Sequence, residues 1–112
     1  MTKVLFICGK NRRRSPSAEE IFVGMDGVEV SSAGVSAEAV CPVSADLLEW
    51  ADRVFVMEQS QKRYLNAHFA RSLKDKKIVC LNIPDRYSYM QPELVTVLRA
   101  KVLPLLHRSK GL

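Results

Sequence analysis

Short apolar runs alternate along the chain with segments in which apolar residues recur at spacings of three and four. Short runs rich in Val, Ile, Leu and Phe are typical of buried strands, and the recurring spacings are typical of amphipathic helices. The predicted strands cover residues 3–7, 28–31, 52–57 and 77–81. The predicted helices cover residues 16–25, 44–51, 59–70 and a segment that begins at Pro92. Strands that alternate with helices indicate an α/β fold with a parallel sheet and helices on both of its faces.

The same pattern makes predictions for several single side chains. Trp50 and Tyr64 are expected in the core, on the apolar faces of their helices. Cys41 and Cys80 are expected to be buried as small hydrophobic residues. Pro104 is expected to kink or end the last helix, because proline has no N–H to donate.

Length and composition indicate a single compact domain over residues 1–112, with a frayed basic tail at about 108–112. The 112 residues are 47% hydrophobic, which is enough for one core, and the chain is too short for two. The three cysteines are an odd number and lack the spacing of metal ligands. Neither a disulfide framework nor a metal site is therefore expected.

The chain is expected to be cytoplasmic and to bind no membrane. No apolar run approaches the ~18 residues of a membrane span, and the first three residues lead into a strand without the apolar region of a signal peptide. The net charge of +5 invites a nucleic-acid interpretation. However, the basic residues form separate groups without zinc-finger spacing or an aromatic RNA-binding motif, so a nucleic-acid partner is not favoured.

The stretch between the first strand and the first helix has the features of an anion-binding loop. Ser15 is a good helix N-cap and Pro16 suits the first helical turn, so the preceding N–H groups can converge on one point. A helix N-terminus with a nest of amides favours a tetrahedral anion such as phosphate, sulfate or vanadate. The candidate phosphate-binding residues are Gly9, Lys10, Asn11, Arg12, Arg13 and Ser15.

Two side chains at the ends of this loop carry the predicted chemistry. Cys8 ends the first strand and faces the start of the helix, where the helix field and nearby arginines favour a thiolate. Arg14 closes the loop, and its planar fork can hold two oxygens of a phosphoryl group. The pair predicts a nucleophile, Cys8, and a phosphate clamp, Arg14.

The loop that follows the last predicted strand is the second candidate segment. It leaves the carboxyl end of a strand, where ligands bind in open α/β sheets, and Asp85 is its one acidic residue. Attack of a thiolate on a phosphate ester releases an oxygen that needs a proton, so Asp85 is the candidate general acid, with a simple turn residue as the alternative. Tyr87 and Tyr89 are expected to wall the cleft, and Ser32 is expected near the anion loop.

The pattern C-x5-R-S-P directly after the first strand resembles the low-molecular-weight protein tyrosine phosphatases. The further segments that carry the resemblance are Ala18-Glu19, Ser32-Ala33-Gly34 and residues 51–57. The resemblance implies a flavodoxin-like three-layer domain with a four-stranded parallel sheet in the order 2-1-3-4. It also implies that Asn11 shapes the loop and that the Ser15 hydroxyl supports the thiolate.

Together with these residues, the resemblance implies a hydrolase with a cysteinyl-phosphate intermediate. Cys8 would attack in line, Arg14 and the loop amides would hold the phosphoryl oxygens, and Asp85 would protonate the leaving oxygen. No cofactor and no metal is expected, because Arg14 and the amides supply the positive charge. The implied substrate is a phosphotyrosine-containing protein or another phosphomonoester.

Three other functions remain open. An arsenate reductase shares the loop but needs a further pair of nearby cysteines, whereas Cys41 and Cys80 lie far apart in the sequence. A sugar-phosphotransferase subunit also carries a cysteine after its first strand, although Arg14 favours hydrolysis. A non-catalytic module that binds phosphate or phosphopeptides would use the same loop without turnover.

Overall fold

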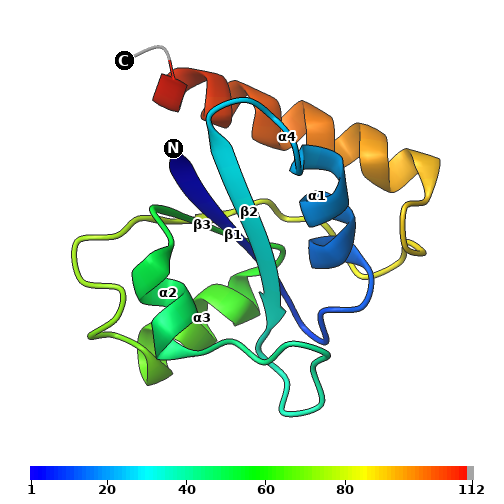
Figure 1. Cartoon of the computed structure of the whole chain (residues 1–112). Helices are drawn as coiled ribbons and strands as arrows, with labels where there is room; N and C mark the ends of the chain where they lie inside the picture. Colours follow the sequence, from blue (N-terminus) through cyan, green and yellow to red (C-terminus); the bar gives the residue numbers. More distant parts are fainter. Residues whose placement is uncertain (111–112) are drawn as a thin grey trace.

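The computed structural model of the chain describes the backbone of residues 1–110 and the side chains of residues 1–106. Within these residues, four parallel strands form one sheet in the order β2-β1-β3-β4. Figure 1 labels β1, β2 and β3 of this sheet and the four helices. The strands are β1 (Thr2–Cys8), β2 (Val28–Gly34), β3 (Arg53–Val56) and β4 (Ile78–Cys80). The helices are α1 (Arg14–Phe22), α2 (Ala45–Trp50), α3 (Gln59–His68) and α4 (Pro92–Lys110). The predicted fold class and strand order are confirmed.

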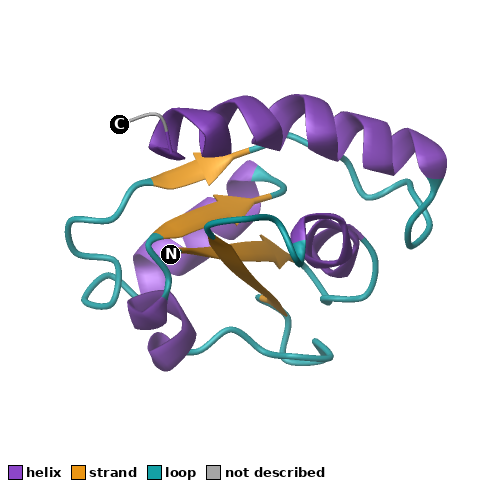
Figure 2. Ribbon diagram, turned by 45° about the horizontal axis from the view of Figure 1, so that its top comes forward, coloured by secondary structure: helices purple, strands orange, loops and turns teal. Residues whose placement is uncertain are grey.

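The helices form two layers, α1 and α4 on one face of the sheet and α2 and α3 on the other (Figure 2). Side chains of β1 alternate between these two layers. Phe6 faces α1 and α4, and its ring lies beside those of Phe22 and Phe55, with centroids 5.7 and 5.5 Å away. Leu5 and Ile7 face α2 and α3. Because both faces of β1 are buried, its sequence is a continuous apolar run rather than an alternating one.

The register aligns the carboxyl ends of the strands along one edge of the sheet. Cys8 pairs with Gly34 across β1 and β2, and Val56 pairs with Cys80 across β3 and β4. Parallel strands all release their following loops at the same edge. The loop after β1 therefore lies beside the segments that follow β2, β3 and β4.

The start of α1 differs from the sequence prediction. Its N-cap is Arg13, whose side chain makes no capping hydrogen bond, and Ser15 lies inside the first turn. The predicted N-cap role of Ser15 is therefore wrong. The reason is that the Ser15 hydroxyl contacts the Cys8 sulfur and the Asn11 amide, both at 2.9 Å, instead of a helical N–H. Pro16 does lie in the first turn, where its missing N–H costs nothing.

β2 is longer than predicted, and the segment after it is more exposed. The strand pairs with β1 as far as Gly34, so residues 32–34, which follow the predicted strand at 28–31, also belong to it. The Gly34 N–H donates to the Cys41 carbonyl at 2.9 Å. This contact uses only the backbone of Cys41, and its side chain is exposed. The predicted burial of Cys41 is therefore wrong.

Helix α3 turns a narrower apolar face to the sheet than predicted. Leu65 is fully buried, but Tyr64 is 37% exposed and its ring packs on that of His68, with centroids 4.4 Å apart. Neighbouring helical residues point in directions about 100° apart, so the buried position of Leu65 leaves Tyr64 at the surface. The predicted core position of Tyr64 is wrong. Trp50 and Cys80 are partly buried against the same side of the sheet.

Helix α4 packs along the sheet with Leu94, Leu98 and Val102 fully buried. It continues past Pro104 up to Lys110, so Pro104 does not end the helix. The backbone of the predicted tail at 108–112 is helical as far as the description extends, and residues 111–112 lie outside it. Among the described residues, no helix is long and apolar enough to cross a membrane.

Candidate active site

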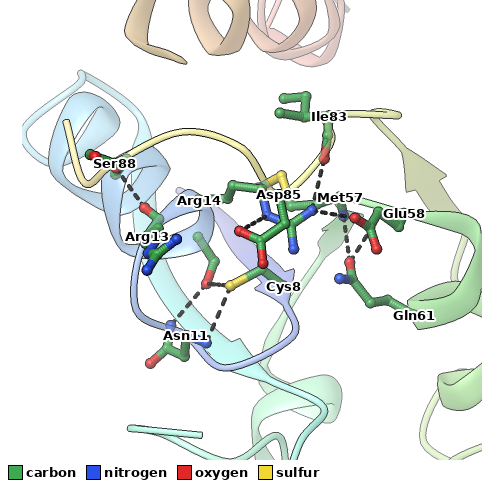
Figure 3. A network of polar contacts seen from close by, with 12 residues as sticks. Cys8, Asn11, Arg13, Arg14, Met57, Glu58, Gln61, Ile83, Asp85 and Ser88 are labelled. Carbon is green, nitrogen blue, oxygen red and sulfur yellow. Dashed lines mark hydrogen bonds and ion pairs between the residues drawn. The ribbon is translucent and has the colours of Figure 1, made fainter. Parts of the chain in front are cut away.

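Cys8 lies at the end of β1, and its sulfur has two hydrogen-bonding contacts (Figure 3). The side chain is 3% exposed. The Asn11 backbone N–H donates to the Cys8 sulfur at 3.2 Å, and the Ser15 hydroxyl lies 2.9 Å from it. Donors that point at a sulfur stabilise its anionic form more than its neutral form. The contacts therefore suit a thiolate nucleophile.

Asn11 holds the loop in the conformation that these contacts need. Its φ of 56° is in the left-handed region, which asparagine tolerates better than most residues. Its side-chain amide donates to the Ser15 hydroxyl at 2.9 Å and to the Ser32 hydroxyl at 3.0 Å. Ser32 in turn donates to a Glu19 carboxylate oxygen at 2.5 Å. Ser15 accepts from Asn11, and its own proton has two acceptors within reach, the Cys8 sulfur at 2.9 Å and the Ala33 carbonyl at 3.3 Å.

Arg14 is 4% exposed and is fixed on one side by two acceptors. Its Nη1 donates to Glu58 Oε1 and to the Ile83 carbonyl, both at 2.8 Å. Its Nε lies 3.7 Å from Asp85 Oδ1. These bonds use both protons of Nη1, and Nη2 makes no hydrogen bond with any described residue. The guanidinium therefore keeps donors available for an anion.

A cleft of about 440 Å³ brings the predicted catalytic residues together. Cys8, Arg14 and Asp85 all line it. Cys8 and Arg14 lie at the two ends of the loop between β1 and α1, and Asp85 lies in the loop after β4. The Asp85 side chain is 57% exposed, and the hydrogen bond from Arg14 to the Ile83 carbonyl anchors the segment that precedes it. The other residues that line the cleft are Gly9, Lys10, Arg12, Arg13, Val35, Ser36, Glu58, Ser60 and Gln61.

Three predicted cleft residues do not line this cleft. Tyr87 is half-buried against the core on the α1 and α4 side, with the Arg86 guanidinium 5.5 Å from its ring centroid. Tyr89 is 51% exposed. Ser32 is buried and contacts the anion loop only through Asn11. The expectation that Tyr87 and Tyr89 wall the cleft is wrong, because the loop turns their rings elsewhere.

Glu58 is a site residue that the sequence interpretation did not select. It directly follows β3 and is the N-cap of α3, where its side chain and that of Gln61 form a capping box. Glu58 therefore holds both the start of α3 and the Arg14 guanidinium. The rule that ligands bind at the carboxyl ends of parallel strands, which indicated Asp85, also indicates Glu58.

The remaining cysteines lie away from the cleft. No disulfide joins any of the three cysteines, Cys8, Cys41 and Cys80, and only Cys8 lines the cleft. The Cys80 thiol instead donates to the Asn82 side chain at 3.3 Å. Among the described residues, no group of three or more His, Cys, Asp or Glu side chains is arranged to hold a metal ion.

Comparisons with known proteins agree with this geometry. Residues 3–79 match the family model described as low molecular weight phosphotyrosine protein phosphatase. The YwlE arginine phosphatase from Geobacillus stearothermophilus is similar in structure, with a TM-score of 0.78, 23% identity, and coverage of 98% of this chain and 96% of that one. A low molecular weight protein tyrosine phosphatase from Streptococcus pyogenes has a TM-score of 0.77, 19% identity, and coverage of 96% and 93%. A YwlE mutant from Bacillus subtilis has a TM-score of 0.74, 25% identity, and coverage of 96% and 99%. No curated protein matches the sequence significantly.

Proposed function

Since the chain belongs to the low molecular weight phosphotyrosine protein phosphatase family, we propose that it hydrolyses phosphomonoesters through a cysteinyl-phosphate intermediate. One observation carries this proposal. The Cys8 sulfur accepts from the Asn11 N–H and contacts the Ser15 hydroxyl, and it lines the same cleft as Arg14 and Asp85. A nucleophile, an anion clamp and an acid therefore surround one space.

In the first step, the Cys8 thiolate attacks phosphorus and the bond from phosphorus to the ester oxygen breaks. Arg14 and the loop N–H groups hold the non-bridging oxygens, whose charge the site must balance in the transition state. Asp85, protonated at this stage, gives its proton to the departing oxygen. The products are the free alcohol or phenol and a phosphate bound covalently to Cys8.

In the second step, water attacks phosphorus and the bond from phosphorus to sulfur breaks. Asp85, now a carboxylate, takes the proton of the water, which restores its starting state. The electron pair of the broken bond returns to Cys8 as a thiolate, which the Asn11 N–H and the Ser15 hydroxyl stabilise. The mechanism needs no cofactor, because Arg14 and the amides supply the positive charge.

We further propose phosphotyrosine in a protein as the substrate, and family membership supports this choice. The cleft itself offers no aromatic wall among its lining residues, because Tyr87 and Tyr89 lie outside it. A direct comparison of phosphorylated substrates therefore tests specificity for the aromatic ring.

The test is the hydrolysis of p-nitrophenyl phosphate by the wild-type protein and by Cys8→Ser. The wild type should turn over, and Cys8→Ser should lose turnover by more than a thousandfold, because serine is not ionised at neutral pH. Rapid acid quench of the wild type should trap phosphate on Cys8. Turnover of Cys8→Ser within tenfold of the wild type would refute the role of Cys8.

The same experiment separates the alternatives. A non-catalytic module would bind vanadate or inorganic phosphate in the cleft but show no turnover in the wild type. An arsenate reductase would consume a thiol reductant when arsenate is added. Matched peptides that carry phosphotyrosine, phosphoserine or phosphoarginine then rank the substrates by kcat/KM, and a preference for either of the last two would refute the assignment of phosphotyrosine.

A further inference from the structure

Three cations at the mouth of the cleft have no ion-pair or hydrogen-bond partner among the described residues. We call the side chains of Lys10, Arg12 and Arg13 the basic rim. All three are exposed and line the same cleft as Cys8. Among the described residues, none of the three side chains takes part in an ion pair or a hydrogen bond. The rim therefore does not serve to tie the loop to the rest of the fold.

The carboxylates that could neutralise the rim are engaged elsewhere. Glu58 and Asp85, the two acidic residues that line the cleft, both face Arg14, at 2.8 and 3.7 Å. Glu19 accepts from Ser32 at 2.5 Å. The rim thus keeps its full positive charge beside the place where the phosphoryl group would bind. Like charges so close in sequence repel one another, and no described carboxylate lies within ion-pair distance of the rim.

The rest of the cleft has few apolar side chains that could contact an aromatic or apolar leaving group. Apart from the loop, the acids and Arg14, its lining side chains are Val35, Ser36, Ser60 and Gln61. Substrate atoms beyond the phosphoryl group therefore meet mainly charged and small polar side chains. Under these conditions, charge rather than ring stacking distinguishes one substrate from another.

We propose that the basic rim binds a second anionic group of the substrate, so that the preferred phosphomonoester carries a carboxylate or a further phosphate beside its ester. This inference rests on the proposed phosphatase activity and specifies its substrate class. An arginine fork pairs well with carboxylate and phosphate oxygens, and attraction extends over a Debye length of about 10 Å at 0.1 M salt. The rim also disfavours a cationic leaving group, such as the guanidine of phosphoarginine.

The experiment compares two phosphotyrosine peptides that differ only in their flanks, Asp and Glu in one and Asn and Gln in the other. The measured quantity is the ratio of their kcat/KM values, since a ratio cancels any loss common to both peptides. The test variant is Arg12→Gln/Arg13→Gln. The control variant, Arg71→Gln/Lys74→Gln, removes two exposed cations from the connection between α3 and β4 and changes the net charge equally.

At low salt the wild type should favour the acidic peptide by roughly tenfold or more, the size expected if each rim cation adds a few-fold to binding. The test variant should bring the ratio close to one, and so should 0.5 M salt in the wild type. The control variant should keep the wild-type ratio. A wild-type ratio near one, an unchanged ratio in the test variant, or an equal fall in both variants would overturn the proposal.

Two further arms complete the design. A hexose bisphosphate compared with the hexose monophosphate gives the same ratio for small molecules, and the larger of the two wild-type ratios identifies whether a free metabolite or a protein segment supplies the second anion. If the wild type hydrolyses no phosphomonoester at all, the proposed activity fails. The rim is then tested by the dissociation constants of the same two peptides, which need no turnover, with the same variants and the same criteria.

Discussion

Gly34 packs against the backbone of the anion loop, and alanine at this position should displace that loop and lower activity. The residue ends β2 directly opposite Cys8, and it is buried. A Cβ at Gly34 would lie 2.5 Å from the Gly9 carbonyl oxygen, 2.9 Å from the Asn11 backbone nitrogen and 2.8 Å from the Ala39 Cβ. Two of these atoms belong to the backbone of the loop, which cannot rotate away as a side chain would.

The size of the effect follows from these distances. Cβ atoms do not approach other heavy atoms within 3.0 Å, so the Gly9 carbonyl must move by at least about 0.5 Å. Overpacking of a well-packed region costs about 1–3 kcal/mol of unfolding free energy. The same movement displaces the N–H of Asn11 from the Cys8 sulfur. A misplacement of about 1 Å can cost a hundredfold in rate, so Gly34→Ala should lose roughly ten- to a hundredfold in kcat.

The assay joins urea unfolding with kcat and vanadate affinity on the same samples. The control is Gly24→Ala, because Gly24 has a φ of +84° and its Cβ would meet no atom within 4 Å. The free energy of unfolding of this variant should be about 1 kcal/mol lower because of backbone strain, and its kcat should be unchanged. If Gly34→Ala has wild-type kcat and vanadate affinity, or if Gly24→Ala loses as much activity, the close approach of β2 does not position the loop.

Three further predictions concern single side chains. Asp85→Asn should lower kcat about a hundredfold for poor leaving groups and much less for good ones, and an equal loss across a series of aryl phosphates would make Asp85 structural. Glu58→Gln keeps an acceptor for Arg14 but removes a negative charge beside the anion site, so inorganic phosphate should inhibit at several-fold lower concentration, and unchanged inhibition would contradict this. Ser44→Ala removes the N-cap of α2, whose hydroxyl accepts from the Leu47 N–H at 3.2 Å. This substitution should lower the free energy of unfolding, measured in urea, by about 1 kcal/mol without changing kcat. A large loss of kcat would contradict a purely structural role for Ser44.

The sequence predicted the fold, and it placed Cys8 and Arg14 at the two ends of one loop, because both features are local or periodic. The apolar run of β1 is continuous because helices cover both of its faces, and that property is visible without coordinates. Cys8 and Arg14 belong to one short loop between a strand and a helix, so the backbone between them brings them together. Asp85 was predicted at the same edge because parallel strands release their loops there, and it does line the cleft.

Only the tertiary structure decided where a side chain points when its partners lie far away in the chain. Serine is a common N-cap residue, but the Ser15 hydroxyl contacts the Cys8 sulfur and the Asn11 side-chain amide instead. Tyr87 and Tyr89 follow Asp85 as an aromatic wall would, yet Tyr87 packs against the core, Tyr89 is exposed, and neither lines the cleft. Local sequence sets which conformations a residue can adopt. Which of them forms at these positions depends on contacts with distant residues, and those contacts exist only once the sheet has assembled.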